Sequence, residues 1–266
     1  MTRTPSAFIP TSRGGKQQRY WMETGLTCTL SRPRYIRLLV LITLALVVLG
    51  TVKEIQEAYD RDYRSASRGV VRLRALFDLN GEQNIPAWFS TLNLITCAAL
   101  LTVIGTAKRR EKEKFAVQWF ILAGIFLFLG FDEAFAIHEE LNAPLRSALG
   151  LGGFQLDPDA TSLFYYSWVI PYGILTIIVG LLYIPLLLRL PARIRMGFVA
   201  AGFMYVTGAL VLEMVEGWYQ SAYTARLGYV VLYVTEEALE LGGVVLFINS
   251  LLTYMRERWP VVSFCL

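Results

Sequence analysis

Residues 115–141 read FAVQWFILAGIFLFLGFDEAFAIHEEL, and this stretch decides the class of fold. Residues 115–131 carry no charge, and about 20 apolar residues in a helix are enough to cross the hydrocarbon core of a membrane. Residues 132–141 hold four carboxylates and the chain's single histidine: Asp132, Glu133, His138, Glu139 and Glu140. An unneutralised carboxylate in a membrane is costly, so protons, cations or a partner must compensate it. The stretch therefore predicts a membrane-spanning helix that ends in an acidic site.

Five further segments are long and apolar enough to cross a membrane. The sequence thus predicts an all-α fold, a polytopic membrane bundle of six transmembrane helices. The predicted spans are about 35–52, 86–107, 115–137, 163–188, 196–218 and 227–254. The composition of the 266 residues agrees, with 55% hydrophobic and 17% charged residues and a mean hydropathy of +0.47. These values exclude an ordinary soluble domain, and the lipid bilayer is the expected partner.

Basic residues are concentrated in the segments that a six-span arrangement places on one side of the membrane. They precede the first span and recur in 108–114 (KRREKEK), 189–195 and 256–258. The positive-inside rule assigns this side, and both termini, to the cytosol. The segments 1–34 and 259–266 are then cytosolic tails, the first basic and disordered, and 53–85 is a periplasmic loop. Because the basic charge follows the membrane, nucleic-acid binding is not expected.

Acids also occur in the fifth and sixth predicted spans. Glu213 and Glu216 lie near the outer end of the fifth, and Glu236, Glu237 and Glu240 lie inside the sixth. With the orientation above, all three acidic groups fall in the outer half of the bilayer. Unrelated helices would not need to agree in depth, so the pattern predicts one shared site.

The position of His138 depends on where its helix ends. In a continuous helix of 100° per residue, its side chain points away from the midpoint of the four neighbouring acids. It joins the site only if the helix ends or unwinds nearby, which Asn142 and Pro144 favour. His138 is then a candidate metal ligand or catalytic general base. For Glu139 and Glu140, an exposed helix end at the outer interface is the alternative.

The acids and the histidine form a candidate metal site. The predicted ligands are Asp132, Glu133, His138, Glu139, Glu213, Glu216, Glu236, Glu237 and Glu240. Oxygen ligands with one imidazole suit Mn²⁺, Ca²⁺, Mg²⁺ or Fe²⁺, whereas Zn²⁺ and Cu²⁺ prefer more His or Cys. The predicted spans offer no Lys or Arg at this depth apart from Arg226, so internal salt bridges are a weaker explanation. Protonated carboxylates of a proton-coupled protein are the alternative, and the sequence does not separate metal from proton.

Glycines in the last two spans predict close packing between helices. Gly197, Gly202 and Gly208 lie in the fifth span, and Gly242 and Gly243 lie in the sixth. Small residues at such positions allow the backbones of membrane helices to approach closely.

Five motifs make the chain resemble a group of uncharacterised bacterial multi-pass inner-membrane proteins. The motifs are FDLNGEQNIPAWFS (Phe77–Ser90), FDEAFAIHEEL (Phe131–Leu141), WVIPYG (Trp168–Gly173), EMVEGWY (Glu213–Tyr219) and EEALELGG (Glu236–Gly243). The resemblance implies a bacterial inner-membrane location and a single site that joins the acids, Glu82 and the WVIPYG segment. It implies no activity, substrate or cofactor.

Three functions fit the sequence, and whether the protein is an enzyme stays open at this level. The first is a cation- or proton-binding transport or permeation protein, possible as a homo-oligomer, which requires a path from the acids to the cytosol. The second is a metal-dependent membrane enzyme acting on a lipid or small molecule at the periplasmic face. It requires a closed inner half, with His138 or a free carboxylate as general base. The third is a non-catalytic membrane sensor or assembly factor.

Overall fold

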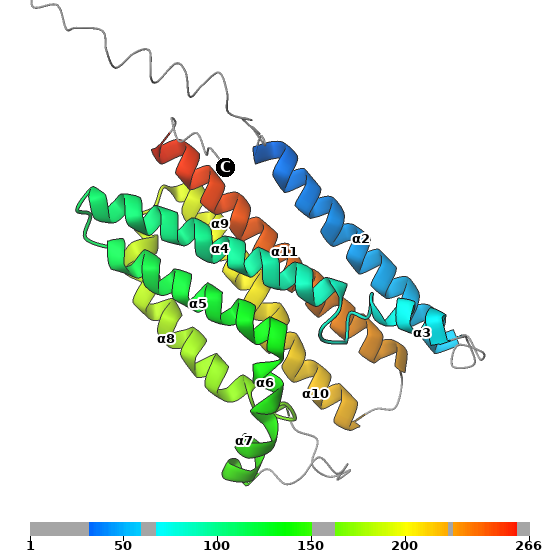
Figure 1. Cartoon of the computed structure of the whole chain (residues 1–266). Coiled ribbons are helices and arrows are strands. Elements are labelled where there is room, and N and C mark those ends of the chain that lie inside the picture. The colour runs from blue at the N-terminus through cyan, green and yellow to red at the C-terminus, as the bar shows by residue number, and fades with distance from the viewer. Residues whose placement is uncertain (1–31, 60–67, 151–162, 223–225, 260–266) are drawn as a thin grey trace, which may run out of the picture.

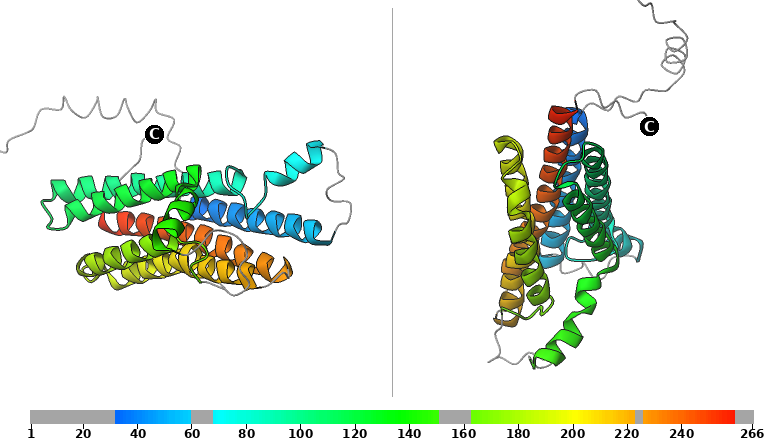
Figure 2. Two further views of the ribbon diagram at one scale, coloured as in Figure 1. Left: turned by 90° about the horizontal axis from the view of Figure 1, so that it is seen from below. Right: turned by 90° about the vertical axis from the view of Figure 1, so that its left-hand side faces the viewer.

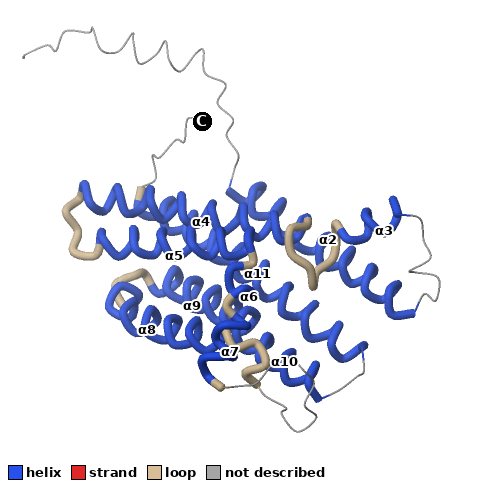
Figure 3. The backbone as a smooth tube through the Cα atoms, turned by 60° about the horizontal axis from the view of Figure 1, so that its bottom comes forward, coloured by secondary structure: helices blue, strands red, loops and turns tan. Residues whose placement is uncertain are grey.

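The computed structural model describes residues 32–59, 68–150, 163–222 and 226–259. Every regular element within these residues is helical, which confirms the predicted all-α class (Figure 3). Most of the predicted N-terminal tail (1–31), part of the predicted periplasmic loop (60–67) and most of the predicted C-terminal tail (260–266) lie outside the described residues.

Helix α11 (Arg226–Arg258) is the centre of the bundle (Figure 1). It packs on α2 (Arg32–Tyr59), α4 (Ile85–Arg110) and α9 (Ala192–Val206). Helix α4 in turn packs along α5 (Ala116–Phe135), because only a short turn joins them. Figure 2 shows the α4–α5 pair on one side of α11 and the layer of α8, α9 and α10 on the other. Two groups of helices therefore face each other across one central helix.

Five helical segments are long and apolar enough to cross a membrane. They are α2 from Arg32 to Glu57, α4, α5, α8 (Val169–Leu187) and the continuous helical run Ala192–Ser221. Their outward faces carry large exposed apolar side chains, which suits contact with lipid rather than water. The protein is therefore an all-helical membrane protein. Helix α11, which covers the predicted sixth span, is not among the five, and the count of six remains a prediction.

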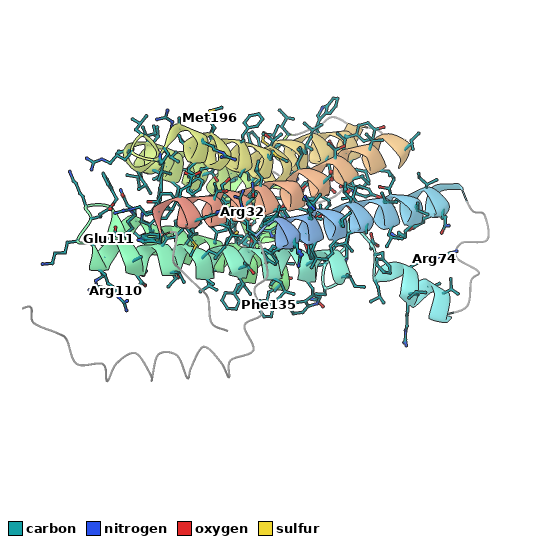
Figure 4. All side chains as sticks on the ribbon, turned by 90° about the horizontal axis from the view of Figure 1, so that it is seen from above. Arg32, Arg74, Arg110, Glu111, Phe135 and Met196 are labelled. Carbon is teal, nitrogen blue, oxygen red and sulfur yellow. The ribbon has the colours of Figure 1, made fainter. Side chains whose placement is uncertain are left out.

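Three of the basic segments meet at one end of the bundle. Arg258 at the end of α11 donates to Glu111 Oε2 at 2.7 Å, and the Arg189 guanidinium lies 4.5 Å from the centre of the Phe115 ring. Arg32 is placed deeper, since it donates to Asn249 Oδ1 (2.8 Å), about 14 Å before the end of α11. Figure 4 shows Glu111 at one end, Arg74 toward the other and Arg32 between them. The assignment of the basic end to the cytosol remains a prediction.

The glycines confirm close packing between α9 and α11, with one exception. A Cβ atom at Gly243 would lie 2.9 Å from Tyr205 N, and one at Gly208 would lie 3.0 Å from the Glu236 carbonyl oxygen. The two backbones touch at these positions, so only glycine fits. The prediction for Gly202 was wrong, because nothing lies within 4 Å of its missing Cβ. Gly202 lines a cavity instead of a contact between helices.

Candidate functional site: an acidic cavity

One cavity of about 1260 Å³ lies among α5, α8, the α9–α10 run and α11. All nine predicted ligands line it, together with Glu82 and Glu140: Asp132, Glu133, His138, Glu139, Glu213, Glu216, Glu236, Glu237 and Glu240. No Lys or Arg of the described residues lines this wall. The structure thus brings the three acidic groups together, and it places no basic side chain among them.

A widened helical turn sets the direction in which Glu216 projects from its helix. Residues Thr207–Leu212 form a π-helical turn, η2, between α9 and α10 (Glu213–Ala222). Eight residues of regular α-helix would rotate Glu216 about 80° past Gly208, away from α11. The extra residue that a π turn absorbs removes about 100° of this rotation, so Glu216 returns to the face of Gly208. Such turns are frequent at functional sites.

Three carboxylates from two helices lie close together in the site. Oxygen atoms of Glu213, Glu216 and Glu236 all lie within 4.8 Å of one another. Glu216 is 3% exposed and Glu236 is 8% exposed. Glu216 Oε1 and Glu236 Oε2 have no hydrogen-bond partner among the described residues. A buried carboxylate group of this kind needs a proton or a cation to offset its desolvation.

A second group is formed by Glu82, His138 and Glu139, whose donor atoms also lie within 4.8 Å of one another. It contains an imidazole, and its members are less buried than Glu216 and Glu236. Both three-residue groups open on the same cavity. Glu133, Glu237 and Glu240 line the cavity without belonging to either group.

His138 reaches the cavity because the helix breaks at Ala136, two residues earlier. Helix α5 ends at Phe135, Ala136 adopts a left-handed conformation (φ 50°, ψ 42°), and α6 (Ile137–Glu140) begins a new helix. The break meets the condition that the sequence set for His138. A left-handed alanine is strained, and strain of this kind is found at functional sites.

Asp132 fixes the orientation of His138. Its Oδ1 accepts from the His138 backbone N–H (2.8 Å) and from the Tyr172 hydroxyl (3.3 Å), while its Oδ2 lies 3.3 Å from His138 Nδ1. The Trp168 ring lies against the imidazole, with ring centres 4.6 Å apart. Nδ1 is thus held by Asp132, and Nε2 is the nitrogen left for a ligand or a proton.

The acids around His138 make its imidazole a stronger base. Burial alone would lower the pKa of His138, but the hydrogen bond and charge of Asp132, with smaller contributions from Glu82 and Glu213, outweigh it. The pKa of His138 is therefore raised above its ordinary value. His138 responds to acids from three different parts of the chain.

Glu82 is a site residue that the ligand prediction did not include. The segment before α4 folds back because Asn84 Oδ1 accepts from Ala87 N (3.0 Å) while Asn84 Nδ2 donates to Asp78 O (2.6 Å). Leu79 anchors this segment in a small apolar cluster with Tyr233 of α11. Burial raises the pKa of Glu82 to about 7. Only the resemblance through FDLNGEQNIPAWFS pointed to Glu82, since no periodicity places a loop residue in a membrane site.

The inner part of the cavity, which we call the inner arm, is apolar. It runs between α5, α8 and α9 and is lined by side chains such as Leu122, Phe126, Val179 and Phe198. Beyond it, Trp119 is 1% exposed and stacks on Tyr254 with ring centres 5.4 Å apart, and Ile194 is fully buried. The cavity is therefore acidic at one end and apolar along its depth toward the basic end of the bundle.

The fold and this cavity define a class: polytopic helical membrane proteins with a buried carboxylate site. The chain belongs to the family described as "Domain of unknown function (DUF8692)", whose definition matches residues 38–255. This confirms an uncharacterised family that covers most of the chain. No curated protein and no solved structure is detectably similar to this chain.

Proposed function

We propose that the protein is a metal-dependent membrane enzyme that acts on a lipid or small amphipathic molecule at its acidic end. The observation that carries this proposal is the pair of buried carboxylate oxygens, Glu216 Oε1 and Glu236 Oε2, which lack any hydrogen-bond partner among the described residues. They lie beside Glu213, and no Lys or Arg of the described residues lines the cavity. A divalent cation would supply the missing charge.

The ligand chemistry favours a hard cation. Glu213, Glu216 and Glu236 offer only carboxylate oxygens, which suit Mn²⁺, Mg²⁺, Ca²⁺ or Fe²⁺. Three carboxylates leave coordination positions for water and for an oxygen of the substrate. A cation held there would polarise that oxygen and would lower the pKa of bound water. His138, held by Asp132 and facing the same cavity, is the candidate general base.

The inner arm supports an enzyme over a permeation pathway. No charged side chain of the described residues lines the cavity between its acidic end and its apolar inner end. An ion would have to leave its ligands for an apolar passage, which is unfavourable. All site residues come from one chain, so the proposal requires no homo-oligomer. We place the protein in a bacterial inner membrane, with the basic end cytosolic and the acidic end periplasmic.

Metal analysis of the detergent-purified protein tests the proposal. We expect near-stoichiometric Mn²⁺ or Ca²⁺ in the wild type after purification without chelator, and loss of at least tenfold in affinity in Glu216→Gln and Glu236→Gln. Glu257→Gln, which alters an exposed carboxylate at the other end, serves as the matched control. At a hundredfold excess over the Kd, metal should stabilise the wild type by about 2.7 kcal/mol. Absence of metal from the wild type, even with both ions offered back, would favour protonated carboxylates and reject the proposal.

A second experiment separates catalysis from transport. The protein is reconstituted in liposomes of bacterial membrane lipid with Mn²⁺, and lipid products and ⁵⁴Mn²⁺ uptake are followed together. We expect new lipid products that depend on Glu236 and His138, and uptake no faster than in protein-free liposomes. Metal uptake that Glu236→Gln abolishes, without any lipid product, would support a transporter instead.

A further inference from the structure

We propose that the inner arm holds the hydrocarbon chain of an amine-bearing lipid whose head lies among the carboxylates. This inference names the substrate class of the same cavity and so rests on the function proposed above. The cavity volume, about 1260 Å³, exceeds the range of about 300–1,000 Å³ that is usual for small-molecule pockets. Its acidic end is small compared with the apolar depth behind it, which suits an amphipathic molecule with one long chain.

Two hydrogen bonds between α5 and α8 mark off an interval along the arm that is as long as a lipid chain. Two hydrogen bonds cross between α5 and α8, from the Tyr172 hydroxyl to Asp132 (3.3 Å) and from the Tyr183 hydroxyl to the Gln118 carbonyl oxygen (2.7 Å). Eleven helical residues separate the two tyrosines, a distance of about 16 Å. One leaflet of a membrane has a hydrocarbon thickness of about 15 Å, half of the full core. The interval between the two bonds therefore matches one extended chain.

Glycines give the arm its width. Gly124 of α5, Gly180 of α8 and Gly202 of α9 all line the cavity, and nothing lies within 4 Å of the missing Cβ of any of them. Glycine inside a helix is less stable than alanine by about 1 kcal/mol. No neighbouring backbone requires glycine at these three positions, in contrast to Gly208 and Gly243. All three glycines instead leave open space in the cavity, where a larger side chain would narrow the arm.

The arm opens sideways toward the bilayer. Ile121 and Phe128 of α5 and Leu175 of α8 line the cavity and are also 52%, 45% and 54% exposed on the molecular surface. They lie in the interval between the two tyrosine bonds. A lipid chain can therefore reach the arm from the membrane without passing through water.

The negative charge of the cavity wall favours one kind of lipid head group. Ten carboxylates and one imidazole line the cavity, and no Lys or Arg of the described residues faces them. A phosphate or carboxylate head would find no basic side chain of the described residues on this wall. A primary ammonium is attracted and donates hydrogen bonds to carboxylate oxygens. Charge complementarity therefore favours an amine over an anion.

Photo-crosslinking in lipid nanodiscs tests this inference with the full chain. The probe is a long-chain primary alkylamine with a diazirine at its chain end, compared with a fatty acid of equal length carrying the same group. We expect the amine to label α5, α8 and α9 around the arm at least fivefold more than the exposed face of α2, which reports ordinary lipid contact. Equal labelling of α2 and the arm, or equal labelling of the arm by the fatty acid, would overturn the proposal.

Filling the arm provides the matched variants. Gly180→Leu and Gly202→Leu should each reduce labelling of the arm at least fivefold. Gly173→Leu is the control, because Gly173 lies on the same helix as Gly180, has open space before it and does not line the cavity. Thermal unfolding of each variant identifies any that fails to fold. If one of the two filled variants does not fold, labelling of the other one tests the proposal. Labelling that is unchanged in a folded filled variant would overturn the proposal.

The two proposals fail separately. Metal content is measured on the same samples, and filling the arm should leave it unchanged. Protein that binds metal without retaining the amine probe would leave the proposed function standing and reject the chain site. Protein that retains the probe in the arm without binding metal would do the reverse.

Discussion

At the scale of single residues, the site depends on backbone conformations that are unusual for the side chains present. Ala136 is left-handed, and this conformation separates α5 from α6 and turns His138 toward Asp132. An L-residue in this region is strained by about 1–2 kcal/mol relative to a right-handed helix. The surrounding contacts of Asp132 must supply the compensation.

Substitutions at Ala136 should therefore separate strain from side-chain chemistry. Ala136→Val adds a branched Cβ to a left-handed residue and should destabilise the protein by about 2 kcal/mol. Ala136→Gly should stay within about 1 kcal/mol of the wild type, because relief of strain offsets the larger entropy of the unfolded chain. Denaturant unfolding in detergent measures both. Ala134→Val, in the regular part of α5, is the control, and an equal loss there would contradict the explanation.

Residue chemistry was readable from the sequence, whereas residue geometry was readable only in part. Charged residues in apolar runs mark Glu213, Glu216 and Glu236 without any structure, because the cost of burial is general. The inward turn of His138 required a helix break that the sequence made conditional. Glu82 was absent from the predicted ligands, since its position depends on the hydrogen bonds of Asn84 and no short-range pattern encodes them.

At the scale of elements, the π turn sets the rotation of α10 relative to α9. Deleting Val211, a 49% exposed residue within η2, should convert the turn to regular α-helix. Glu216 should then stay on the same helix face as Gly208. Inserting one alanine between Leu212 and Glu213 should rotate the acids by about 100°. We expect the deletion to retain metal binding within about threefold and the insertion to abolish it. Loss in both variants would show that the turn itself supplies a ligand or an essential contact.

The contact between α9 and α11 is the closest approach of two helices around the site. Gly243→Ala should destabilise the protein by about 1–3 kcal/mol, because its Cβ would meet Tyr205 N and Ala201 O at 2.9 and 3.0 Å. Gly202→Ala, in the same helix pair, should be neutral or stabilising by up to about 1 kcal/mol. Thermal unfolding with matched detergent compares them. The sequence treated these glycines alike, since helical spacing does not reveal which face meets a neighbour and which meets a cavity.

At the scale of the whole molecule, the membrane class follows from hydropathy and the cavity does not. Five long apolar helices satisfy the physical requirement for crossing a bilayer, and each was predicted from composition alone. Helix α11 differs because it is central, so its acids face the cavity and its apolar residues pack against other helices. The inner arm arises from three glycines on three helices, which only the assembled bundle brings together.

The proposed lipid entry between α5 and α8, in the interval between the bonds of Tyr172 and Tyr183, has a kinetic consequence. A ligand that enters there arrives by two-dimensional diffusion within one leaflet. Occupancy then follows the mole fraction of the ligand in the bilayer, and its bulk concentration has no separate effect. Diluting the ligand tenfold with inert lipid, at constant total amount in the sample, should lower the initial rate of probe labelling about tenfold. The concentration that governs binding is therefore the number of ligand molecules per area of membrane.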